Sequence, residues 1–251
     1  MKEESKSEEN TELGRRNFLA GIAGTAGLAI TPGVTLFSFP GSAEKKTGAT
    51  AKVRWGMLID TRKCAEDCNE CVSACFTENG IGSTGRPGTD PQWIRKLDIH
   101  DPKTDRKVSL PMLCQHCAHP PCVDVCPTGA SFKRADGIVL VDKHSCIGCR
   151  YCMMACPYQA RSFVHEDLTD QKTDVPRGKG TVESCTLCVH RIDKGGTPAC
   201  VEACSDTGGK AMLFGDLNDP NSEISKRIEK YASQEVRADL GLDLGVRYQG
   251  I

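Results

Sequence analysis

The sequence has few aromatic residues and no excess of charge of either sign. Phe, Trp and Tyr make up 5% of its 251 residues, and 32 Lys and Arg nearly balance 33 Asp and Glu. No basic stripe with interleaved aromatic residues occurs, so nothing points to a nucleic-acid partner. Hydrophobic residues amount to 39% on a count that includes sixteen cysteines, which leaves little apolar material for a core. We therefore expect bound metal to help stabilise the fold, because binding free energy adds to folding free energy.

Signatures of catalysis and of several cofactors are also missing. The sequence shows no nucleophile–base pair and no flavin or nucleotide fingerprint. It has no C-x-x-C-H haem attachment motif, because Cys117 is followed by Ala118 and Cys188 by Val189. We predict no catalytic residues, no substrate turnover by this chain alone and no small-molecule substrate of its own.

The first 43 residues have the features of an export signal. Arg15 and Arg16 lie in the run Gly-Arg-Arg-Asn-Phe-Leu, an apolar stretch rich in Gly and Ala follows, and Gly41-Ser42-Ala43 ends it with small residues. The run resembles a twin-arginine signal, a route that exports folded proteins with their cofactors inserted. We predict a signal segment at 1–43 and a periplasmic (extracytoplasmic) location. Cleavage or retention of the segment stays open, and a cytoplasmic helix is the alternative.

From residue 64 onward the sixteen cysteines fall into four groups of four. The groups are Cys64-x3-Cys68-x2-Cys71-x3-Cys75, Cys114-x2-Cys117-x4-Cys122-x3-Cys126, Cys146-x2-Cys149-x2-Cys152-x3-Cys156 and Cys185-x2-Cys188-x11-Cys200-x3-Cys204. The third group, followed by Pro157, is the bacterial ferredoxin run. Three closely spaced thiolates wrap one cluster, and the fourth cysteine of such a run ligates the other cluster of a pair. The spacing therefore predicts [4Fe–4S] clusters.

Zinc and disulfides are the competing interpretations of these cysteines. Two C-x2-C pairs would suffice for a four-cysteine zinc site, but zinc requires no third closely spaced cysteine followed by a fourth and a proline. Cysteines two residues apart rarely satisfy the geometry of a disulfide. Three histidines near the groups, His116, His119 and His144, are expected to make loop hydrogen bonds because each group is already complete.

Two of the groups carry a family resemblance. Cys114-Gln-His-Cys117-Ala-His-Pro-Pro-Cys122-Val-Asp-Val-Cys126 is similar to the second motif of the iron–sulfur subunits of the dimethyl sulfoxide reductase family. Cys185-Thr-Leu-Cys188-Val-His-Arg and Pro198-Ala-Cys200-Val-Glu-Ala-Cys204 resemble its fourth motif. The resemblance covers about residues 53–225. Among relatives with a twin-arginine signal, the chain most resembles the periplasmic iron–sulfur subunit of the sulfite-reduction-associated complex DsrMKJOP.

The resemblance implies four [4Fe–4S] clusters with ligands exchanged between groups. The implied sets of iron ligands are Cys64, Cys68, Cys71 and Cys204; Cys185, Cys188, Cys200 and Cys75; Cys114, Cys117, Cys122 and Cys156; and Cys146, Cys149, Cys152 and Cys126. Two departures from the family pattern fall at the first set: three residues separate Cys64 from Cys68, and Ser205 stands where proline is usual. We expect that cluster to differ in potential or exposure.

The expected fold is α+β, with two ferredoxin-like 2[4Fe–4S] modules and extensive loops. The outer module combines residues 53–107 with 181–218, the inner module spans 108–180, and 219–251 form a C-terminal helix and tail. Bound clusters are strongly negative, and nearby cations would offset that charge. The candidate cations are Lys133, Arg134, Arg150, Arg161 and Arg191.

Local patterns predict several elements. Residues 53–60 are expected to form a strand, and 130–142, with an Asp-Gly turn, a hairpin. A helix is expected after Pro220 because Ile224, Ile228 and Tyr231 recur at helical spacing. Residues 79–105, rich in Gly, Pro and Asp, are expected to be irregular.

Together these features predict an electron-transfer subunit that relays electrons within a membrane-associated respiratory complex. The expected partners are an integral-membrane quinone-interacting subunit and other redox subunits. A free periplasmic polyferredoxin carrier is the alternative, and a purely structural use of the metal is a third possibility.

Overall fold

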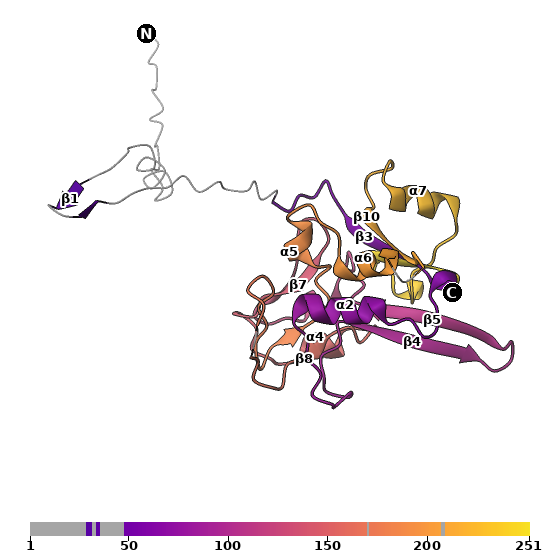
Figure 1. Cartoon of the computed structure of the whole chain (residues 1–251), viewed down its shortest axis with the longest axis horizontal. Coiled ribbons are helices and arrows are strands. Elements are labelled where there is room, and N and C mark those ends of the chain that lie inside the picture. Colours follow the sequence, from indigo (N-terminus) through magenta and orange to yellow (C-terminus); the bar gives the residue numbers. More distant parts are fainter. Residues whose placement is uncertain (1–28, 32–33, 36–47, 170, 207–208) are drawn as a thin grey trace, which may run out of the picture. The chain divides into compact units, whose positions relative to one another are not determined.

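The computed structural model describes residues 29–31, 34–35, 48–169, 171–206 and 209–251 (Figure 1). The chain divides into two units, Met1–Lys45 and Lys46–Ile251. In the first unit, β1 (Ala29–Thr31) and β2 (Val34–Thr35) pair in antiparallel fashion. The rest of the predicted signal segment lies outside the described residues. Among those described, no helix is long and apolar enough to cross a membrane.

The second unit contains a three-stranded sheet. Its middle strand, β3 (Trp55–Asp60), pairs antiparallel with β10 (Met212–Asp216) and parallel with β11 (Val246–Gln249). The strand predicted over 53–60 is thus confirmed. No regular structure was predicted after the C-terminal helix, yet this part of the chain supplies β11.

Two helices carry cysteines on buried faces and pack against each other. They are α2 (Glu70–Asn79) and α6 (Ala199–Asp206) (Figure 1). Residues four apart share a helix face, so Cys71 and Cys75 point the same way from α2, and α6 carries Cys200 and Cys204 in the same arrangement; all four are buried. The packing of α2 on α6 therefore brings cysteines from the first and fourth groups together.

A long hairpin occupies part of the segment that was expected to be irregular. β4 (Ile94–Asp101) pairs with β5 (Arg106–Leu113) along its full length. The prediction for 79–105 is therefore wrong over 94–101. The apolar positions Ile94, Leu97 and Ile99 do not keep strict alternation, and the last two are exposed, so the strand lacks the period-two signal of a half-buried strand.

Short elements complete the unit. Strands β6 (Ser131–Lys133) and β7 (Val139–Val141) form the predicted hairpin, and β8 (Ser162–Phe163) pairs with β9 (Val182–Glu183). The remaining helices are α3 (Pro121–Asp124), α4 (Tyr151–Met154), α5 (Val189–Ile192) and α7 (Glu223–Lys230), with 3-10 turns η1 (Thr61–Lys63) and η2 (Ala238–Leu240). Helix α7 confirms the helix predicted after Pro220, although Tyr231 lies just beyond it as its extended C-cap. Ser222 caps the start of the helix by accepting a hydrogen bond from the Ser225 N–H. The helix packs on β10 and carries the fully buried Ile224. The architecture is a mixture of helices and small sheets, as the α+β prediction required.

Candidate metal centres

All sixteen cysteines are free thiols in the structure. Ten are buried, five are half-buried and Cys149 alone is exposed. Burial raises the pKa of the Cys114 and Cys117 thiols to about 12, because a thiolate is poorly solvated away from water. A bound cation would have to supply the charge that deprotonates them. Among the described residues, no three Cys, His, Asp or Glu side chains are arranged to hold a single metal ion.

The thiols interact electrostatically in four groups, and each group combines two parts of the sequence. Cys71 interacts with Cys64, Cys68 and Cys204; Cys185 with Cys75, Cys188 and Cys200; Cys117 with Cys114, Cys122 and Cys156; and Cys152 with Cys146 and Cys126. Cys149 joins the last of these, because one small cavity is lined by Cys126, Cys146, Cys149 and Cys152. The structure therefore brings together the sets that the family resemblance implied. Their role as iron ligands stays a prediction.

The four groups are also neighbours in pairs. Cys122 interacts with Cys152 across two groups, and Cys200 interacts with Cys71 across the other two. Cys75 also interacts with Cys71, so thiols of the two sets influence each other in both pairs.

The last cysteine of each sequence group accepts a hydrogen bond at its sulfur. The donors are Ser131 N to Cys126 (3.3 Å), Ala160 N to Cys156 (3.5 Å), Ala211 N to Cys204 (3.3 Å) and the Asn79 side-chain amide to Cys75 (3.5 Å). N–H groups directed at sulfur stabilise its negative charge and raise the potential of a bound cluster. This repeated feature has no signature in the cysteine spacing.

Several buried donors beside the groups have no hydrogen-bond partner within the described residues. They are His116 Nε2, the Nε and Nη1 atoms of Arg161, and the hydroxyls of Ser131 and Thr186. Buried polar groups are nearly always paired, and an anionic cluster would accept hydrogen bonds through its sulfur atoms. Four sets of thiols with unpaired donors beside them therefore fit iron–sulfur clusters.

The histidines make loop hydrogen bonds, as expected. His116 accepts one at Nδ1 from the Val139 N–H (3.0 Å), and burial, with the charge of Arg161, lowers its pKa to about 3. The backbone N–H groups of His119 and His144 donate to Leu242 O and Asp142 Oδ1. His116 is therefore neutral, with its proton on Nε2.

Of the five candidate cations, Arg161 alone has a thiol as its hydrogen-bond partner within the described residues. Arg134 and Arg191 form ion pairs with carboxylates, Arg150 lies 3.8 Å from the centre of the Phe163 ring, and Lys133 donates to the Ala118 carbonyl. Sequence reasoning missed Lys96, because the segment containing it was expected to be irregular. Lys96 donates to the carbonyls of Ala65 and Glu66, and its side chain is 4% exposed.

The third sequence group is the most exposed. Beside Cys149, the apolar side chains Ile147, Tyr151 and Met154 are 67%, 57% and 84% exposed. Cys64 and Cys68, at the irregular first motif, are only half-buried, and Lys96 ties down the loop between them. We expected the first group to differ from the others in exposure, but the third group is more exposed than the first.

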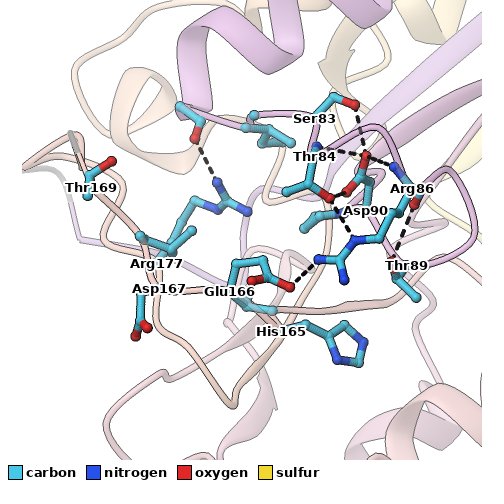
Figure 2. A pocket seen from close by; sticks show the side chains of 16 residues that line it. Ser83, Thr84, Arg86, Thr89, Asp90, His165, Glu166, Asp167, Thr169 and Arg177 are labelled. Atoms are coloured by element: carbon cyan, nitrogen blue, oxygen red, sulfur yellow. Dashed lines mark hydrogen bonds and ion pairs between the residues drawn. The ribbon is translucent and has the colours of Figure 1, made fainter.

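A pocket of about 400 Å³ has no cysteine in its lining. It is formed by residues 80–91, 164–169 and Arg177. Figure 2 shows Asp90 accepting hydrogen bonds from Ser83 and Thr84, and Arg86 paired with Glu166. The polar groups of this pocket are largely satisfied by one another.

Gly148 should be intolerant of substitution. It lies between Cys146 and Cys149 with a φ of 69°, and a Cβ atom there would overlap the backbone carbonyl of Gly180. We expect Gly148→Ala to lose about four iron atoms and to lower the thermal midpoint, because backbone cannot move aside as a side chain can. Gly195→Ala is the matched control, since Gly195 also has a positive φ (80°) but open space around it. Equal iron content in the two variants would contradict the prediction.

Comparison with known proteins gives a consistent set of relatives. Residues 106–217 match the family model of a 4Fe-4S dicluster domain. The chain is 43% identical to the "Hdr-like menaquinol oxidoreductase iron-sulfur subunit 1" of Archaeoglobus fulgidus, over 94% of this chain and 97% of the relative. It is 38% identical to one of the subunits of the tetrathionate reductase of Salmonella typhimurium (96% and 90%) and 36% identical to NrfC of Escherichia coli (90% and 91%). The chain therefore belongs to the family of non-catalytic iron–sulfur electron-transfer subunits of dimethyl sulfoxide and tetrathionate reductase type.

Proposed function

We propose that this chain carries four [4Fe–4S] clusters and relays electrons between the partners of a membrane-associated respiratory complex. The observation that carries the proposal is the convergence of sixteen free thiols into four sets of four, each drawn from two sequence groups. Each set is proposed to hold one cluster, with Cys204, Cys75, Cys156 and Cys126 as the ligands supplied by the other group. Bound clusters supply one-electron redox chemistry. The chain holds them, buries them and directs N–H groups at their sulfurs.

The paired arrangement of the sets supports two ferredoxin-like modules. The sets joined by Cys122 and Cys152 would belong to the inner module, residues 108–180. The sets joined by Cys71 and Cys200 would belong to the outer module, residues 53–107 and 181–218. The outer module would also include β11, which pairs with β3.

The apolar surface at Ile147, Tyr151 and Met154 is proposed as the contact for a redox partner. These residues lie within five positions of Cys149, the one exposed thiol, so a partner covering them would approach a bound cluster closely. An integral-membrane, quinone-interacting subunit is proposed among the partners, supported by the menaquinol oxidoreductase named in the relative from A. fulgidus. Within the family, we place the chain nearest the periplasmic subunit of the DsrMKJOP type, with export by the twin-arginine route supported by Arg15 and Arg16.

Iron analysis of anaerobically purified protein tests the proposal. We expect about sixteen iron atoms per chain and, during a dithionite titration, several interacting S = 1/2 EPR signals at distinct potentials. Zinc counted in the same samples should be negligible. Fewer irons with a [3Fe–4S] signal would reveal an incomplete cluster at the irregular first group. Intact protein with no iron and no redox response would overturn the proposal.

A further inference from the structure

Arg161 is a buried cation whose contacts are thiols from two different sets. Arg161 is only 5% exposed to solvent. Its Nη2 atom donates to the Cys122 sulfur at 3.1 Å, and its charge acts on the Cys152 sulfur. Its charge reaches Cys114 as well. One guanidinium group therefore lies between two of the proposed cluster sites.

Among the described residues, no carboxylate balances this charge. Arg161 forms no ion pair with Asp or Glu there, and its Nε and Nη1 atoms have no hydrogen-bond partner. A charge buried in this way is strongly disfavoured unless an anion lies beside it. Thiolates and the clusters they would hold are the negative groups at this place, and they would accept the unpaired N–H donors.

Arg177, a second buried arginine, differs from Arg161 because a carboxylate balances its charge. Arg177 is equally buried, but it makes a two-pronged ion pair with the fully buried Glu183, at 2.8 and 3.0 Å. The position of Arg161 is fixed by its neighbours: Ala160 donates its N–H to the Cys156 sulfur, and Ser162 begins β8. The fold thus holds an unbalanced positive charge where two sets of thiols meet.

We propose that the positive charge of Arg161 raises the reduction potentials of the two clusters held at the second and third groups. The inference rests on the proposed function. Reduction adds an electron to an already negative cluster, and a fixed cation within a few ångströms stabilises the reduced form more than the oxidised form. The effect falls on both clusters of this pair, because the guanidinium hydrogen bonds to a ligand of one and acts electrostatically on a ligand of the other. The other two clusters keep their potentials.

Redox potentiometry followed by EPR on the intact chain tests this proposal. In Arg161→Met we expect two of the four midpoint potentials to fall, each by at least about a tenfold change in the equilibrium constant of reduction, which is about 59 mV for one electron. Arg161→Lys, which keeps the charge, should recover most of the shift. Lys133→Met is the control: it removes an exposed cation from the same part of the chain, whose side chain donates only to the Ala118 carbonyl, and it should leave the midpoints almost unchanged because solvent screens an exposed charge.

Several outcomes would overturn the proposal. Full iron content with four unchanged midpoints in Arg161→Met would do so, as would an equal shift in all four. If Arg161→Met loses iron, Arg161→Gln is measured as a second uncharged variant. Iron lost from both and retained in Arg161→Lys supports the role of the charge, whereas iron lost from all three shows a packing role and overturns it. Failure of the proposed function would appear separately, as wild-type protein without the four clusters.

Discussion

Cys126→Ser should damage the same cluster as Cys149→Ser, although Cys126 belongs to a different sequence group. The structure places Cys126 in one cavity with Cys146, Cys149 and Cys152. By the same argument Cys156→Ser should damage the same cluster as Cys117→Ser, because Cys156 lies with the second group. Each variant is expected to lose between one and four of about sixteen irons and one specific EPR signal. A serine oxygen is a poor substitute for a thiolate ligand, so the effect should be large.

Which variants lose the same EPR signal shows whether the fourth ligand of each cluster comes from the same sequence group or from another one. If each sequence group held its own cluster, Cys126→Ser would instead match Cys117→Ser, and Cys156→Ser would match Cys149→Ser. Comparison of the four dithionite-reduced EPR spectra therefore tests the assignment without any need to know which signal belongs to which cluster. Loss of all signals in every variant would show that the clusters do not assemble independently. It would contradict the prediction that each variant loses one specific signal.

The second large effect is expected at a buried ion pair that contains no cysteine. Arg177 and Glu183 are 5% and 0% exposed in their side chains and lie 2.8 Å apart. Arg177→Met would leave the buried Glu183 without its hydrogen-bonded partner and with only the charge of Lys143 nearby, and breaking a buried pair typically costs about 3–5 kcal/mol of unfolding free energy. Arg177 also donates to the Gly80 carbonyl (2.6 Å) just after α2 (Figure 2), so the end of the helix that carries Cys75 would loosen. The midpoint of anaerobic guanidinium unfolding measures the loss.

Two further variants separate the missing charge from other effects. In the double variant Arg177→Met/Glu183→Leu the isolated charge is gone, and we expect stability to recover towards the wild-type value. Arg237→Met removes an exposed ion pair between Arg237 and Asp239, whose side chains are 56% and 61% exposed, and it should leave the unfolding midpoint almost unchanged because solvent screens such a pair. If Arg177→Met were as mild as Arg237→Met, the pair would not stabilise the fold in the way proposed.

Features set by spacing along the chain were predictable from the sequence. The cysteine groups identified the cofactor class, the Asp-Gly turn identified the β6–β7 hairpin, and apolar residues at helical spacing identified α7. Each of these signals depends on neighbours within about ten residues. The grouping of thiols between distant parts of the chain was implied by the family resemblance, because spacing alone does not say which two groups meet.

Features that depend on contacts between distant residues were not predictable. Strand β4 shows no clear alternation, because its outer half is exposed on both faces and its partner, β5, supplies the pairing. Arg161 was one of five candidate cations, and nothing in its sequence neighbourhood distinguishes it from Arg134, which is tied to two aspartates. Burial and the nearest anion decide between them, and both are set by the folded chain.

The parallel pairing of β11 with β3 has a consequence for the order of assembly. Val246 faces Met57 in the register, so this contact joins residues separated by nearly the whole folded unit. Contacts of such high sequence separation form late, because a long loop must close first. When residues 108–180 have emerged from the ribosome, all cysteines of the second and third sequence groups have been synthesised. Cys185 to Cys204 and β11 have not yet been synthesised. If the second and third groups hold a pair of clusters as proposed, nascent chains should acquire their first clusters there, and the sites that need Cys185 to Cys204 should be the ones left empty when iron is scarce.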